Sequence, residues 1–155
     1  MKRYVSLVIV FLLSMQTLTC YSISKGSNMY INKRLSIQFK IPQSWGDDYK
    51  VVEVKNKGQY DIVVFKSRIK NEEIILLELW VVQKKIWNYE KDFYKLNKLK
   101  EYGDNIYAYS RPNLKGILEN ICEDVKKEDE SYKKEVIGKY IDEKDIEARI
   151  HIKLH

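Results

Sequence analysis

The chain contains few of the residue types that most enzyme active sites and disulfide-rich folds require. Its 155 residues include two cysteines, two histidines, two prolines and six glycines. Both histidines, His151 and His155, lie within the last five residues, where a domain is usually least ordered. No HExxH, CxxC, GxSxG, GxGxxG or P-loop pattern occurs. The sequence therefore offers little support for a zinc protease, a serine hydrolase, a dinucleotide enzyme or a P-loop enzyme.

The cysteines and histidines also give little support for a disulfide framework or a metal site. With only Cys20 and Cys122 available, a hydrophobic core must hold the domain together. Cys122 falls in the apolar stripe of a predicted helix, where we interpret it as a buried core thiol. His151 and His155 would be ~13 Å apart on a strand, too far to share one ion, whereas a helix would place them on one side. We interpret them as a solvated pair and expect no metal or other cofactor.

The positive charge is modest and scattered. The formal net charge is +6, and the five arginines are never adjacent to one another. A nucleic-acid-binding protein normally concentrates Lys and Arg on one face. We therefore expect no nucleic-acid partner and interpret the charge as a solvated surface, with attraction to anionic wall polymers or lipid headgroups as the alternative.

The first 24 residues have the pattern of a secretory signal peptide. Lys2 and Arg3 precede an almost wholly apolar run from Tyr4 to Met15, and polar residues follow. This run is too short for a comfortable transmembrane helix of about 20 residues. We expect residues 25–155 to form a single domain on the extracytoplasmic side, secreted or tethered to the outer face of the cell membrane.

Three outcomes are open at the end of this signal. Cys20 follows the apolar run at the position of a lipoprotein cysteine, although the preceding Thr17-Leu18-Thr19 fits that pattern poorly. Ser22 and Ser24 provide the small residues that ordinary cleavage after Ser24 requires. The third outcome is an uncleaved anchor. In each case we expect membrane contact only through the N-terminal signal or a lipid on Cys20.

Alternating apolar residues predict a series of strands in residues 25–110. After a polar leader over residues 25–32, we expect strands over residues 35–41, 49–54, 60–65, 74–82 and 106–110. Residues 43–48 and 56–58 are predicted turns, and residues 83–100 fit either a helix or a strand. A helical period covers residues 114–125, a second helical segment is expected over residues 131–141, and residues 150–154 suggest a final strand or frayed helix. The predicted fold class is α+β.

Carboxylates and aromatic side chains are the remaining candidates for a functional site. Asp47 and Asp48 in a turn, and Glu78 in an apolar strand, could serve as acid and base in a carbohydrate-active enzyme. Their alternative interpretation is a solvated turn and an edge carboxylate with a lysine partner. Trp45 and Trp87 follow strands and are candidates for partly exposed ligand-binding rings, whereas the alternative for Trp45 is an anchor that holds its loop on the core.

A short motif carries a resemblance to known proteins. The segment Phe39-Lys40-Ile41-Pro42-Gln43-Ser44-Trp45, with the strands over residues 77–82 and 106–112, resembles small uncharacterised secreted proteins and lipoproteins of low-GC Gram-positive bacteria. More remotely, it is similar to PsbP-like and DcrB-like domains. That resemblance implies an antiparallel sheet packed with helices in an α-β-α sandwich and a non-catalytic accessory, chaperone or binding role. It supplies no site residues, and residues 126–155 lie outside it.

The leading functional hypothesis is therefore a non-enzymatic binding or accessory protein of the cell envelope. Its expected partner is an envelope protein or a wall polymer. The alternative is a secreted carbohydrate-active enzyme or glycan-binding module, in which Asp47, Asp48 or Glu78 would act with exposed tryptophan rings.

Overall fold

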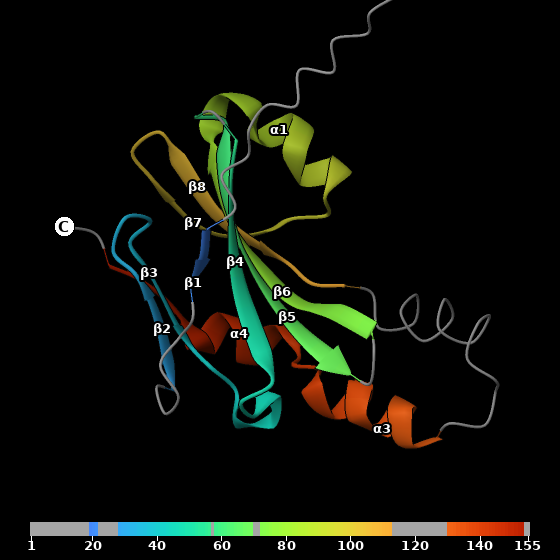
Figure 1. Ribbon diagram of the computed structural model, residues 1–155. Helices are drawn as coiled ribbons and strands as arrows, with labels where there is room; N and C mark the ends of the chain where they lie inside the picture. Colours follow the sequence, from blue (N-terminus) through green and yellow to red (C-terminus); the bar gives the residue numbers. More distant parts are fainter. Residues whose placement is uncertain (1–18, 22–27, 57, 70–71, 113–129, 154–155) are drawn as a thin grey trace, which may run out of the picture.

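A computed structural model describes residues 19–21, 28–56, 58–69, 72–112 and 130–153 (Figure 1). The predicted signal segment lies outside these residues apart from Thr19–Tyr21, and so does the predicted helix over residues 114–125 with Cys122. The described part is an α+β fold with antiparallel sheets, as the sequence predicted. None of its helices has the length and apolar character needed to span a bilayer.

Two sheets and a small set of helices make up this part of the chain. The main sheet has the order β1 (Thr19–Tyr21), β4 (Tyr49–Asn56), β5 (Tyr60–Ile69), β6 (Glu72–Gln83), β8 (Asn105–Ser110) and β7 (Asn97–Tyr102). The second sheet has the order β2 (Met29–Asn32), β3 (Ile37–Lys40) and β9 (Ile150–Ile152). The helical elements are η1 (Gln43–Trp45), α1 (Lys84–Phe93), α3 (Glu130–Lys139) and α4 (Glu143–Arg149).

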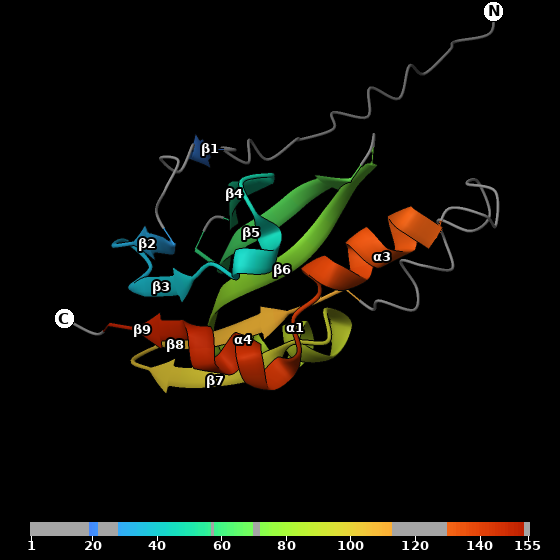
Figure 2. The ribbon, with the colours of Figure 1, turned by 90° about the horizontal axis from the view of Figure 1, so that it is seen from below.

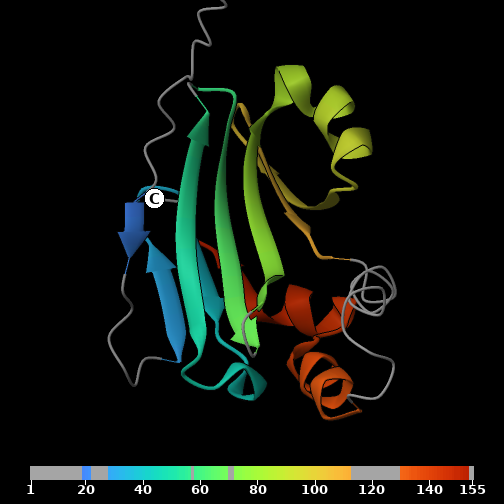
Figure 3. The same ribbon diagram turned by 45° about the vertical axis from the view of Figure 1, so that its right-hand side comes forward.

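The main sheet is covered on both faces. On its inner face, core side chains such as Phe65 and Leu77 pack with Phe39 of the second sheet and with residues of α3 and α4. On its outer face, a smaller cluster around Trp80 packs with Trp87 of α1. Figure 3 shows α1 at one end of the sheet, well separated from α3 and α4. Coverage on both sides explains why β6 is apolar at consecutive positions, since residues of both faces are buried.

Most of the predicted elements are confirmed, with two errors. Residues 28–32 do not form a polar leader, because Met29–Asn32 is a strand in which Tyr30 and Asn32 are buried. Helix α4 was not predicted, because its seven residues bury a single apolar side chain, Ile146. The ambiguous residues 83–100 contain both alternatives, helix α1 and then the start of β7.

Candidate functional site: a groove between β7 and β9

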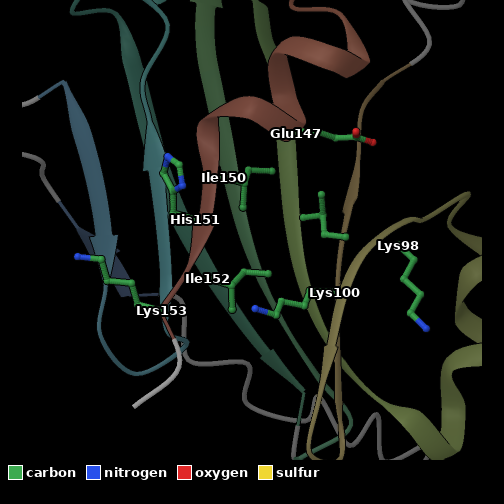
Figure 4. Close-up of a pocket in the computed structure, with 8 residues that line it drawn as sticks. Lys98, Lys100, Glu147, Ile150, His151, Ile152 and Lys153 are labelled. Carbon is green, nitrogen blue, oxygen red and sulfur yellow. The ribbon is translucent and has the colours of Figure 1, made fainter.

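A groove of about 600 Å³ lies between the edge strands of the two sheets. Figure 2 shows β9 and α4 beside β8 and β7, and Figure 4 shows the groove itself. Its lining comes from three elements: Lys98, Leu99 and Lys100 of β7, Glu147 of α4, and Ile150, His151, Ile152 and Lys153 at and after β9. We call this feature the β7–β9 groove.

The floor of the groove is apolar. Leu99, Ile150 and Ile152 are partly buried and pack against the main core. In Figure 4, Ile150 and Ile152 extend from β9 toward β7, whereas His151 and Lys153 extend to the other side. This alternation is the ordinary period of two of a strand. It gives β9 an apolar face inside the groove and a polar, exposed face outside it.

A β-bulge in β7 determines which lysine faces the groove. Lys98 lies opposite Ala108 and Lys100 lies opposite Tyr107, so Leu99 is an extra residue between them. Ala108 belongs to the outer-face cluster and Tyr107 to the inner-face core. Because opposite residues share a face of the sheet, Lys98 lies on the outer face and Lys100 on the inner face, toward the groove (Figure 4).

The same bulge keeps an acidic side chain out of the groove. Glu101 lies opposite Ile106 and accepts from Lys84 and Lys98, both at 2.6 Å. Hydrogen bonds from these two ammonium groups lower the pKa of the Glu101 carboxyl to about 2. Lys98 therefore borders the groove but has its ammonium paired on the outer face, while Lys100 and Lys153 form no ion pair with any residue of the described part.

One carboxylate remains at the groove. Glu147 Oε1 accepts from the Tyr109 hydroxyl at 3.4 Å. Burial, with the negative charge of Glu147 next, raises the pKa of Tyr109 to about 12, so this hydroxyl stays protonated and donates. No hydrogen bond between described residues joins Glu147 to His151. Lys100 faces the apolar floor, Lys153 lies beside the groove on the exposed side of β9, and Glu147 is the carboxylate of the lining.

Trp45 is not at the surface. Its side chain is 0% exposed and packs against Phe39 and Phe65. Trp45 Nε1 donates to the Lys139 carbonyl at 2.8 Å, and Lys139 Nζ donates to the Trp45 carbonyl at 3.0 Å. The expectation of partial exposure is wrong, and the alternative is confirmed: Trp45 anchors the loop after β3 on the core and on the end of α3.

The candidate carboxylates do not form one site. Asp47 and Asp48 are exposed in the turn after η1, where the Asp48 carbonyl accepts from Ser67 Oγ at 2.7 Å. Glu78 lies farther along the sheet on its outer face and accepts from Trp80 Nε1 at 3.2 Å. Burial raises the pKa of Glu78, against the hydrogen bond from Trp80 and the charge of Lys66, which lower it. No hydrogen bond or ion pair links these carboxylates in the described ranges.

Trp87 is half-buried and packs against the outer-face cluster. The most exposed aromatic rings of the described residues are instead Tyr89 and Phe93, one helical turn apart on α1, with exposed fractions of 72% and 67%. Their rings are stacked, with centroids 6.3 Å apart. An i, i+4 spacing on a predicted helix was the signal that could have identified this pair.

A buried polar cluster between the sheets was also missed. Glu53 of β4 accepts from the Tyr30 hydroxyl at 3.0 Å and from Asn32 Nδ2 at 2.6 Å, and its other oxygen lies 3.3 Å from Arg34 Nη2. Burial raises the pKa of Tyr30, which keeps its hydroxyl a donor. Because the carboxylate is fully partnered, we interpret this cluster as a connection that holds the second sheet on the main sheet.

Sequence reasoning missed the groove because it depends on two segments about 50 residues apart and on a bulge that no local pattern indicated. Comparisons with protein-family models, with curated proteins and with solved structures gave no match for this chain.

Proposed function

We propose that this chain is a non-enzymatic binding or accessory protein of the cell envelope, and that the β7–β9 groove binds an anionic partner there. The observation that carries the proposal is the placement of Lys100 and Lys153. Both are exposed and neither has an ion-pair partner among the described residues; Lys100 faces the apolar floor, and Lys153 lies beside the groove on the exposed side of β9. Unpaired cations beside apolar surface favour a ligand that combines negative charge with apolar contact.

The extracytoplasmic part of the proposal rests on residues 1–24. Their basic start, short apolar run and polar end are what a secretory signal requires. The domain would be released after Ser24 or held by a lipid on Cys20. Its anionic partner would then be an envelope protein or a wall polymer.

We also propose that the fold has the α-β-α sandwich arrangement of PsbP-like domains. Two observations support it: α1 packs on the outer face of the main sheet, whereas α3 and α4 pack on the inner face with the second sheet. The resemblance to small secreted proteins of Gram-positive bacteria supports the same class of non-catalytic accessory domain.

The proposal is tested with a charge-matched pair of double variants of the full chain. The first removes the groove cations, Lys100→Ala with Lys153→Ala. The control removes two exposed lysines elsewhere, Lys85→Ala on α1 with Lys134→Ala on α3. The affinity for two polyanions, poly-L-glutamate and polyphosphate, is measured by fluorescence anisotropy at fixed salt concentration.

We expect the groove variant to bind at least tenfold more weakly, since a charge-assisted hydrogen bond contributes roughly 1.5 kcal/mol, about tenfold in affinity. The control should stay within about threefold of the unchanged chain, because it alters only the long-range field. Equal losses of affinity in the two variants would mean that binding follows net charge, which would contradict a specific role of the groove in binding.

A further inference from the structure

We infer that the β7–β9 groove takes an extended acidic peptide, which adds to the second sheet as a strand beside β9. This inference rests on the proposed binding function and deepens it, because it names the chemistry and the conformation of the partner. It depends on three features of β9: its free edge, the alternation of its side chains and the charge around it.

None of the described strands pairs with the edge of β9 that faces away from β3. The sheet order ends at β9, and Lys153 N donates to the Ser36 carbonyl of the β3 side at 3.0 Å. In an antiparallel pair, hydrogen-bonded and non-hydrogen-bonded positions alternate. Ile152, opposite Ile37, is therefore at a non-hydrogen-bonded position, and its N–H and C=O point away from β3.

These backbone groups face the groove. Four consecutive residues, 150–153, line it, which places the edge of the strand itself along the groove. The N–H of Ile150 already donates to the Glu147 carbonyl at the end of α4. Among the described residues, no hydrogen bond engages the Ile150 carbonyl or the two backbone groups of Ile152, so these groups remain for an added strand. Main-chain hydrogen bonds of this kind supply affinity in strand addition, and side-chain pockets supply selectivity.

The side chains of β9 specify an alternating partner. A residue that pairs with Ile152 would point, like Ile152, toward Leu99 and the apolar floor. Its neighbours in the added strand would lie beside His151 and Lys153 on the polar side. An apolar residue flanked by acidic ones fits both environments, with Lys153 on the side of the acidic residues and Lys100 on the β7 wall beside the floor (Figure 4).

Charge also argues against a second copy of this chain as the occupant. Short edge strands with flanking lysines are a common protection against edge-to-edge association. β9 has three residues and is followed by Lys153. Two copies of this edge would place like charges together, whereas a strand that carries Glu or Asp would pair with them.

The test compares two peptides that differ only in their backbone donors. The probe is acetyl-Glu-Val-Glu-Val-Glu-amide, and the control carries N-methyl groups on both valines, with the same charges and side chains. With its valines toward the floor, the peptide would place one valine opposite Ile152 and the other opposite Ile150, so N-methylation of both removes the donors to those two carbonyls. Hydrogen exchange of the Ile152 amide is followed by NMR in the full chain in mild detergent.

We expect the probe at saturation to slow exchange of the Ile152 amide at least tenfold, and the N-methylated control to bind at least tenfold more weakly without this protection. Equal binding of the two peptides, with no protection at Ile152, would overturn strand addition. If Lys100→Ala with Lys153→Ala still weakened polyanion binding in that case, the proposed anion-binding function would stand. If no probe bound at the groove, strand addition and the proposed anion-binding function would both fail.

Discussion

Lys98 and Lys100 are two positions apart in β7, yet their side chains leave opposite faces of the main sheet. In a regular strand they would share a face, but the extra residue Leu99 between them reverses the alternation. Lys98 is consequently paired with Glu101 on the outer face, while Lys100 reaches the groove. β-Bulges often redirect a side chain beside a functional site, and the bulge at Leu99 supports the proposed function for this reason.

The ion pairs on the outer face give a prediction about acid titration. Because hydrogen bonds from Lys84 and Lys98 hold the pKa of Glu101 at about 2, its contribution to stability is present above the unfolded value near 4.5 and is lost as pH falls toward 2. Glu101 is exposed, so solvent screens this contribution. NMR titration should show the Glu101 pKa rising in Lys98→Ala. An unchanged pKa would mean that the Lys98 pair does not form in solution.

The position of Trp45 predicts a large loss of stability on truncation. Trp45→Ala leaves a cavity beside Phe39 and removes the hydrogen bond to the Lys139 carbonyl, so we expect a loss of about 3–5 kcal/mol in the free energy of unfolding. Trp87→Ala should cost less, because that ring is half-buried. Urea unfolding of the two variants measures both losses in the free energy of unfolding. A Trp45→Ala loss below that of Trp87→Ala would contradict the core assignment.

The raised pKa of Glu78 predicts that the effect of Glu78→Gln on the free energy of unfolding depends on pH. Burial raises the pKa of Glu78 in the folded state, so the group favours folding below its unfolded value near 4.5, and that advantage disappears as pH rises through the raised pKa. Glu78→Gln keeps an oxygen for Trp80 Nε1 but no longer buries a charge. The change in the free energy of unfolding caused by Glu78→Gln should therefore be more stabilising, or less destabilising, at pH 7 than at pH 4. Urea unfolding of both proteins at the two pH values measures this change. The opposite trend would show that the charged form is favoured in the fold.

The sequence predicted the central sheet well because its determinants are local. Strands β4, β5, β6 and β8 each have the alternation or the apolar run that a half-buried or fully buried strand requires. The turn between β4 and β5 carries Gly58 at positive φ, and the turn between β7 and β8 carries Gly103. Strand β2 was missed because Asn32, a polar residue, occupies a buried position and is satisfied by Glu53 and Tyr30.

The candidate site could not be predicted in the same way. The local sequence around Trp45 does not determine whether its ring is exposed or buried. The ring is buried because of long-range contacts such as the one with Lys139, 94 residues away. The groove likewise depends on the approach of β9 to β7, and on a bulge at Leu99 that has no Gly or Pro to indicate it. Long-range pairing and local irregularity are the two properties that periodicity does not encode.

The most direct test of the proposed groove compares Lys98→Ala with Lys100→Ala in the full chain. Both variants remove one lysine from the same strand, so their net charge and length are identical. We predict that Lys100→Ala weakens poly-L-glutamate binding about tenfold, whereas Lys98→Ala leaves it within about twofold, because only the Lys100 ammonium faces the groove. Equal effects of the two substitutions would contradict the central claim that the bulge of β7 builds an anion-binding groove.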